Sequence, residues 1–136
     1  MDHSPLKSEQ VQQLSPASWA YLGDAVYELY IRHFYLIPPK RSQLYHQLVV
    51  SQVRAESQAR HLRSLEPHLS TVELEVVRRG RNAAVRCPKR IDPQTYQQAT
   101  SLETLVGYLY LTDPERLSQL LAQLDLETEV KSTDYK

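Results

Sequence analysis

Two stretches of the chain place apolar residues at the three- and four-residue steps of a helix with one buried face. In the first stretch these apolar positions are Trp19, Leu22, Val26 and Leu29. In the second stretch they are Leu102, Leu105, Val106 and Leu109. The spacing predicts two α-helices, each turning this stripe toward the core of the protein.

Each of these expected helices carries a carboxylate close to a glycine. Asp24 follows Gly23, and Glu103 stands one helical turn before Gly107. A glycine inside a helix costs about 1 kcal/mol relative to alanine and is typically kept where another backbone or a ligand comes close. We therefore expect the two helices to cross at the glycines and to bring Asp24 and Glu103 together. A solvated acidic edge is the simpler interpretation of either helix alone.

Capping residues mark four helix starts. A capping side chain followed by proline occurs at Ser15-Pro16, Asp92-Pro93 and Asp113-Pro114, and a proline at the first helical position is pre-set to helical φ. The stretch from Ser70 to Glu73 is a capping box, which predicts a helix from Thr71. Residues 8–14 are expected to add a short helical turn before the first of these helices.

Prolines also predict where the first long helix ends. Pro38-Pro39 should end it near Tyr35, because neither proline supplies an amide hydrogen and both disfavour helix in the preceding residue. The next helical region runs from about Ser42 to Glu66. Its pattern leaves open whether it is one long helix or two.

The remaining segments complete an all-α pattern. Gly80 suits the left-handed C′ position of the helix that begins at Thr71, and residues 82–91 are expected to form a loop. The other apolar stripes are Leu44, Leu48, Val49 and Val53 in the second region, and Leu117, Leu120, Leu121 and Leu124 in the last helix. No segment alternates like a strand, so we expect an all-α helical bundle. It should be one domain over residues 1–136, with flexible tails at about 1–7 and 127–136.

Composition is that of an ordinary globular protein, with 41% hydrophobic and 24% charged residues. No apolar run approaches the length of about 18 residues that a membrane span requires, and no apolar segment of a signal peptide follows Met1. We therefore expect a cytoplasmic protein that makes no membrane contact. Cys87 is the only cysteine, which excludes an internal disulfide and a zinc site built on several thiols. The five histidines show no metal-ligand spacing.

The charge is unevenly distributed although the net charge is zero. Between Val76 and Ile91 there are six basic residues and no acidic one: Arg78, Arg79, Arg81, Arg86, Lys89 and Arg90. From Asp92 onward, eight acidic residues face three basic ones. A concentrated basic segment is typical of a surface that contacts nucleic-acid phosphates, although a solvated charged face is the plain alternative.

Four motifs in this order resemble the ribonuclease III family. AYLGDAVYEL at residues 20–29 resembles the family signature, and SLETLVGYLYL at residues 101–111 resembles its second acidic helix. The stretches from Leu48 to Ala55 and from Arg78 to Asn82 are similar to Mini-ribonuclease III, the short branch without a double-stranded-RNA-binding domain. Together the four motifs cover most of the chain from Leu14 to Leu111.

The resemblance implies a ribonuclease III-type helical fold and an endoribonuclease that hydrolyses double-stranded RNA. The products would carry 5′-phosphate and 3′-hydroxyl ends, and the natural substrate would be the precursor of 23S ribosomal RNA. Asp24 and Glu103 would be the catalytic residues and the ligands of Mg²⁺, with Mn²⁺ as a substitute. The basic segment together with Asn82 would bind the RNA. Family members are homodimers, and the interface candidates are Trp19, Tyr27 and Tyr30.

Physical chemistry supports a cation between Asp24 and Glu103. Two carboxylates at short range repel strongly in a poorly hydrated site, so a cation or a proton must sit between them. Mg²⁺ prefers hard oxygen ligands and binds through one or two carboxylates, several waters and substrate phosphate.

The sequence also departs from ribonuclease III proper, which has two further acidic residues where this chain has Ala20 and Thr100. That departure leaves the number of metal ions open. Two alternatives to the enzyme remain: a non-catalytic helical module that binds double-stranded RNA, and a helical protein-interaction domain.

Overall fold

The computed structural model describes residues 6–84 and 86–128 of the chain. In chain order, its helices are α1 (Ser8–Gln13), α2 (Pro16–Phe34), α3 (Ser42–Val53), α4 (Ala55–Leu65), the short 3₁₀ helix η1 (Glu66–His68), α5 (Thr71–Ala83), α6 (Pro93–Thr112) and α7 (Pro114–Leu121). No strand occurs in the described ranges, which confirms the expected all-α fold. The expectation of flexible tails lies mostly outside the described residues.

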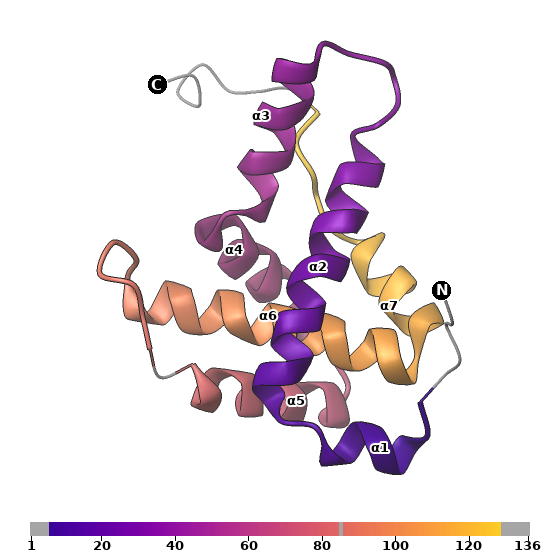
Figure 1. Cartoon of the computed structure of the whole chain (residues 1–136), viewed down its shortest axis with the longest axis vertical. Helices are drawn as coiled ribbons and strands as arrows, with labels where there is room; N and C mark the ends of the chain where they lie inside the picture. The colour runs from indigo at the N-terminus through magenta and orange to yellow at the C-terminus, as the bar shows by residue number, and fades with distance from the viewer. Residues whose placement is uncertain (1–5, 85, 129–136) are drawn as a thin grey trace.

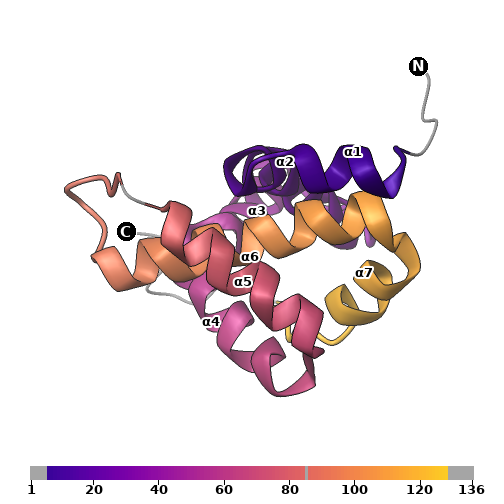
Figure 2. The same ribbon diagram turned by 90° about the horizontal axis from the view of Figure 1, so that it is seen from below.

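Helix α6 is the central element. It contacts α2 on one side and α4 and α5 on the other, with smaller contacts to α1 and α7. Figure 1 shows α2 crossing α6, and Figure 2 shows α6 lying between α2 and the layer formed by α4 and α5. The two helices that the apolar pattern singled out are therefore packed on each other. None of the helices described here is both long and apolar enough to cross a membrane.

The expected helix starts are all present. The Ser15 side chain accepts a hydrogen bond from the Ser18 amide at 3.1 Å, and Asp92 accepts one from the Thr95 amide at 3.1 Å. Ser70 forms its capping box with Glu73. These caps satisfy amide groups that have no partner within the helix. A capping side chain therefore fixes where α2, α5 and α6 each begin.

The core lies around α6 and draws buried apolar side chains from every α-helix. The predicted stripe of α6 is confirmed, since Leu102, Leu105, Val106 and Leu109 are all buried. The four leucines of the last stripe are buried as well, although α7 itself ends at Leu121. In α3, Leu48 and Val49 are buried while Leu44 is exposed.

Of the four residues predicted to form the buried face of α2, only Trp19 is fully buried. The core face consists of Trp19, Ala20, Gly23, Tyr27 and Ile31. Leu29 is instead 69% exposed, and Leu22 and Val26 are only half-buried. Helix α2 is apolar on two adjacent faces, and the face that carries Gly23 packs on α6, because at this glycine the two backbones approach closely.

The structure decides two helix boundaries. One was left open by the sequence, and the other differs from the prediction. The region from Ser42 forms two helices, because Arg54 adopts an extended conformation with φ −70° and ψ 157° between α3 and α4. Gly80 does not end α5: the helix continues to Ala83, and no glycine in the described residues has positive φ. Gly80 is instead buried, and a Cβ there would lie 2.5 Å from Thr104 Oγ1. Close packing of α5 on α6 therefore accounts for this glycine.

Candidate functional site

Helices α2 and α6 touch backbone to backbone at two glycines. A Cβ on Gly23 would lie 1.7 Å from the Glu103 carbonyl oxygen, and a Cβ on Gly107 would lie 1.8 Å from the Trp19 carbonyl oxygen. Real atoms do not approach so closely, so no larger residue fits at either position. The expected crossing at Gly23 and Gly107 is confirmed.

This crossing brings Asp24 and Glu103 into contact. The Glu103 carboxyl group lies next to the Asp24 side chain, and both line one cleft. Burial and the neighbouring Asp24 carboxylate raise the pKa of Glu103 to about 8. Asp24 itself is exposed, whereas Glu103 is half-buried. The pair therefore holds a proton at neutral pH or needs a cation beside it.

A third side chain reaches this pair, and sequence reasoning missed it. Gln58 of α4 lies close enough to the Glu103 side chain to oppose the rise of the Glu103 pKa. Gln58 is only 4% exposed. It lies just beyond the Leu48 to Ala55 motif, and a glutamine in a polar helical stretch resembles a surface residue in the sequence. Its neighbours Ser57 and His61 are also polar, so the sequence does not indicate that this face of α4 is buried.

The two carboxylates open into a cleft between α2, α6 and the end of α5, with a volume of about 350 Å³. One water occupies about 30 Å³ in the liquid, so the cleft has room for a hydrated cation. Arg86, from the loop before α6, lines the same cleft as Asp24 and Glu103. A positive side chain thus faces the space next to the carboxylates.

Ala20 and Thr100 line this cleft too. They occupy the positions where ribonuclease III proper carries its two additional carboxylates. Within the described ranges, no group of three or more His, Cys, Asp or Glu side chains converges as a metal site. Two carboxylates in a wet cleft fit a cation such as Mg²⁺, which keeps several waters and takes further oxygens from a phosphate. They do not fit an ion that is fully ligated by protein.

Two of the candidate RNA-binding residues have partners within the protein. Arg78 forms an ion pair with Glu75 on the outer face of α5, with 2.5 Å between Arg78 NH2 and Glu75 Oε1. The Arg79 guanidinium lies over the Trp19 ring, 4.9 Å from its centroid. Arg79 therefore joins α5 to α2 through a cation–π contact. Part of the basic segment thus stabilises the fold.

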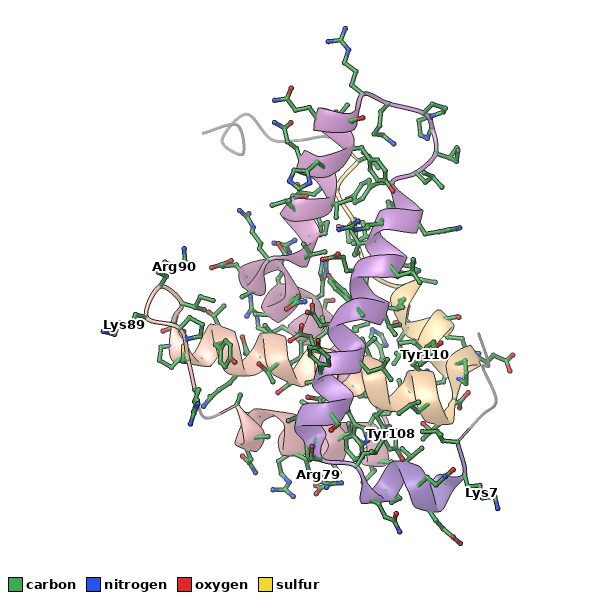
Figure 3. All side chains as sticks on the ribbon, viewed as in Figure 1. Lys7, Arg79, Lys89, Arg90, Tyr108 and Tyr110 are labelled. Atoms are coloured by element: carbon green, nitrogen blue, oxygen red, sulfur yellow. The ribbon has the colours of Figure 1, made fainter. Side chains whose placement is uncertain are left out.

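The remaining candidates lie at the surface. Arg81, Asn82, Arg86, Lys89 and Arg90 are exposed, and the four basic residues among them form no ion pair within the described parts of the chain. Figure 3 shows Lys89 and Arg90 at the tip of the loop before α6, pointing away from the helices, while Arg79 lies beneath α2. These side chains are available to a partner of opposite charge.

The three aromatic candidates for a subunit interface are not at the surface. Trp19 and Tyr27 are fully buried, and Tyr30 is half-buried. Each uses its polar atom within the chain: Trp19 Nε1 donates to the Val11 carbonyl, Tyr27 to the Gln52 carbonyl and Tyr30 to the Leu121 carbonyl. The prediction was wrong for Trp19 and Tyr27, because large aromatic residues on a helix serve the core as readily as an interface. For Tyr30 it stays a prediction.

The outer face of α2 is apolar instead. Tyr21 is 86% exposed and Leu29 is 69% exposed, and Leu22 and Val26 lie half-buried between them. A contiguous exposed apolar strip of this kind is uncommon on a protein that has no partner. Leu22, Val26 and Leu29 of this strip are residues that the sequence pattern had assigned to the core.

The chain is similar in sequence to a known protein family. Residues 17–114 match the ribonuclease III domain family. A protein named Mini-ribonuclease 3 from Synechocystis sp. is 54% identical over 123 residues, covering 90% of this chain and 86% of that protein. A second protein of that name, from Synechococcus sp., is 57% identical over 119 residues, covering 88% and 86%.

The fold is shared with a solved structure as well. A crystal structure from Fusobacterium nucleatum superimposes with a TM-score of 0.78 at 26% sequence identity, covering 85% of this chain and 96% of that one. The residues that match the family model, 17–114, include the α2–α6 crossing with Asp24 and Glu103. On these grounds the chain belongs to the ribonuclease III family of endoribonucleases, in the Mini-ribonuclease III branch.

Proposed function

We propose that this protein is a Mg²⁺-dependent endoribonuclease that hydrolyses double-stranded RNA at the cleft between α2 and α6. The observation that carries the proposal is the contact between Asp24 and Glu103 in a cleft that Arg86 also lines. The two carboxylates lie on helices that cross at two glycines, where no larger residue fits. Mn²⁺ is expected to replace Mg²⁺, since both accept carboxylate and water oxygens.

Each residue has a distinct role in this proposal. Asp24 and Glu103 hold the cation, which when bound polarises the scissile phosphodiester and favours attack by water. Glu103 would hold the cation as the ionised carboxylate, because a protonated carboxyl group is a poor ligand. Arg86 holds a phosphate oxygen of the RNA at the mouth of the cleft. Hydrolysis would leave 5′-phosphate and 3′-hydroxyl ends.

The basic surface accounts for a preference for duplexes. A-form RNA hides its base edges in a deep, narrow groove, so a protein reads its phosphates, its 2′-hydroxyls and its shape. Arg81, Asn82, Arg86, Lys89 and Arg90 together present such contacts from one end of α5 and the adjoining loop. Arg78 and Arg79 are expected to contribute less, because Glu75 and Trp19 already hold them.

A homodimer is part of the proposal. The exposed apolar strip of α2 (Tyr21, Leu22, Val26 and Leu29) is suited to packing against a second copy of itself. Tyr21 also lines the cleft beside Asp24, so the strip and the cleft are adjacent. A duplex lying across both subunits would reach two clefts, one for each strand.

The natural substrate would be a duplex segment of the 23S ribosomal RNA precursor, processed in the cytoplasm. This part of the proposal rests on the resemblance to the Mini-ribonuclease III branch alone.

A cleavage assay tests the proposal directly. The purified protein is incubated with an end-labelled RNA duplex, with Mg²⁺ and with EDTA, and the products are analysed for 5′-phosphate. Asp24→Asn is the key variant. We expect it to abolish cleavage while duplex binding changes less than about threefold, because Asp24 holds the cation and does not contact the RNA phosphates that dominate affinity.

The outcomes separate the alternatives. Cleavage that continues in EDTA, or in the Asp24→Asn variant, would contradict the proposed site. Binding of the duplex without cleavage in any divalent cation would indicate a non-catalytic RNA-binding module. Neither binding nor cleavage would indicate a protein-interaction domain.

A further inference from the structure

Tyr96 of α6 lines the cleft that holds Asp24 and Glu103, and the proposed function gives it no role. It lies four residues before Thr100 and seven residues before Glu103, so the three side chains follow one another along one face of the helix. Seven residues span about 10 Å of an α-helix. Tyr96 therefore lies beside the carboxylates, at the end of the cleft that is next to the loop carrying Arg86.

The hydroxyl group of Tyr96 is unusual among the tyrosines of this protein. The other tyrosines that are buried or half-buried in the described residues each use their hydroxyl group in a hydrogen bond within the chain: Tyr27, Tyr30, Tyr35, Tyr45 and Tyr108. Tyr96 is half-buried as well, but its hydroxyl forms no hydrogen bond to any described residue. No buried side-chain oxygen in these residues lacks a partner, so the Tyr96 hydroxyl must be open to solvent.

The fold accounts for the ring of Tyr96 but not for its hydroxyl group. A phenylalanine would bury the same ring, and a hydroxyl that bonds only to water in the folded chain adds no hydrogen bond on folding. The start of α2 lines the same cleft with Pro16, Ala17 and Ala20, none of which has a polar side chain. A polar group of a ligand that enters there is therefore met mainly from α6 and from the loop before it.

A ribose 2′-hydroxyl is the group of RNA that fits this position. A tyrosine hydroxyl is a neutral group that both donates and accepts a hydrogen bond, as does the 2′-hydroxyl of RNA. Phosphates in this cleft are better matched by the proposed cation and by Arg86, which carry the opposite charge. The minor groove of A-form RNA displays 2′-hydroxyls, and about 10 Å along a duplex corresponds to a few nucleotides of one strand.

We propose that the Tyr96 hydroxyl binds a ribose 2′-hydroxyl a few nucleotides from the scissile phosphate and thereby contributes to the selection of RNA over DNA. The inference rests on the proposed function, because it concerns a duplex bound in the same cleft. A hydrogen bond between two neutral groups is worth about threefold to tenfold in affinity or rate. Tyr96 is thus a specificity-determining residue and takes no part in the chemistry of hydrolysis.

The test pairs the Tyr96→Phe variant with single-atom changes in the RNA. Each ribose near the scissile phosphate is replaced in turn by deoxyribose, and kcat/KM is measured for both proteins on every duplex. Tyr110→Phe is the matched control, because Tyr110 also lies on α6 and its hydroxyl forms no hydrogen bond to the described residues. Tyr110 is 41% exposed and does not line the cleft. Figure 3 shows it toward the opposite end of α6 from Lys89 and Arg90.

We expect one ribose at which deoxyribose lowers kcat/KM of the wild type about threefold to tenfold. Tyr96→Phe should lose the same factor on the all-RNA duplex and lose nothing further at that ribose, because two changes that remove one hydrogen bond are not additive. Tyr110→Phe should match the wild type on every duplex. Losses that multiply at every ribose, or a Tyr96→Phe protein as active as the wild type, would overturn the inference.

Two further measurements show what the hydroxyl serves. The thermal midpoint of Tyr96→Phe should equal that of the wild type, because the hydroxyl has no partner among the described residues, and its affinity for Mn²⁺ without RNA should be unchanged. A lower midpoint would assign the hydroxyl to the fold, and weaker Mn²⁺ binding would assign it to the water shell of the cation; either result contradicts the inference. A wild type that cleaves no duplex would overturn the proposed function as well, which is distinct from independent losses in an active enzyme.

Discussion

Glu103 shows at the scale of a single residue how a functional group can weaken the fold that carries it. Its carboxyl group is half-buried, and Asp24 adds a negative charge next to it. The pKa of Glu103 is raised to about 8 in the folded chain, whereas an unfolded chain ionises glutamate near pH 4.3. Without a cation, ionising Glu103 at high pH therefore costs folding free energy.

We predict that Glu103→Gln stabilises the protein in EDTA at pH 8. The folded wild type binds more protons than the unfolded chain between about pH 4.3 and 8, so its stability falls as the pH rises through this window. The variant lacks this loss of stability, and its gain should be up to about 4.5 kcal/mol at pH 8 and only about 0.5 kcal/mol at pH 4.5. Urea unfolding at both pH values measures it. Equal stability of the two proteins at pH 8 would contradict the buried carboxyl pair.

His61 gives the opposite pH dependence. Burial, helped by the nearby charge of Arg60, lowers the pKa of His61 to about 4. The unfolded chain takes up this proton near pH 6.5, so it binds more protons than the folded chain between pH 6.5 and 4. The stability contributed by neutral His61 is therefore complete above pH 6.5 and is lost as the pH falls toward 4.

We predict that the wild type loses more stability than His61→Gln between pH 6.5 and 4, by up to about 3 kcal/mol. Glutamine keeps a polar partner for Gln52 but does not titrate. Thermal unfolding at half-unit pH steps measures the difference between the two proteins, in which contributions from carboxylates cancel. Parallel pH profiles would show that His61 is solvated in the folded state.

The sequence indicated Asp24 and Glu103 but not Gln58. The two carboxylates stood out because each lies near a glycine in an apolar helix, so their meeting could be inferred from helix spacing. Gln58 lies in a polar stretch of α4, where hydrophobic patterns predict exposure. Its burial follows from the packing of α4 on α6, which depends on the positions of these helices in space.

At the scale of helices, the α2–α6 crossing determines the geometry of the site. We predict that Gly23→Ala destabilises the protein by at least about 3 kcal/mol. The added methyl group would meet the Glu103 carbonyl, and a backbone atom cannot turn aside as a side chain can. Chemical denaturation measures the loss, and cleavage of the duplex should fall with it even under conditions where the variant remains folded. A Gly23→Ala protein as stable as the wild type would show that α2 and α6 can move apart at little cost in free energy.

Boundaries of helices were predictable where local chemistry sets them. Ser15, Ser70, Asp92 and Asp113 cap α2, α5, α6 and α7 as expected, because a cap depends only on neighbouring residues. The role of Gly80 was not predictable: its approach to Thr104 depends on how α5 packs on α6. Which of the two apolar faces of α2 meets the core was likewise decided by packing.

At the scale of the whole molecule, the exposed strip of α2 leads to a prediction about assembly. Leu29→Glu should convert the proposed homodimer to a monomer, because the strip buries this leucine only when a second copy covers it. Light scattering after size-exclusion chromatography measures the mass. Leu74→Glu is the control, since Leu74 is also exposed but lies on α5 away from the strip. A dimeric Leu29→Glu protein, or a wild type that is monomeric, would contradict this interface.

The salt dependence of RNA binding tests the basic surface. We predict that replacing Arg86, Lys89 and Arg90 with glutamine reduces the slope of log affinity against log salt concentration by up to about 2.7 per subunit, since each phosphate contact contributes about 0.9. Arg79→Gln is the contrast: its guanidinium lies over Trp19, so its effect should fall on thermal stability. An unchanged slope in the triple variant would place the RNA on another face.

The glycine contact between α2 and α6 also bears on how this protein can change. The same few backbone atoms hold the two longest helices together and set the spacing of the acidic pair. A substitution at either glycine should therefore change the stability of the fold and the rate of cleavage together. A random library screened for heat tolerance alone should keep both glycines and discard the carboxylates. The selected variants would be thermostable and folded but catalytically inactive. Such a screen would independently identify the residues that the reaction needs and the fold does not.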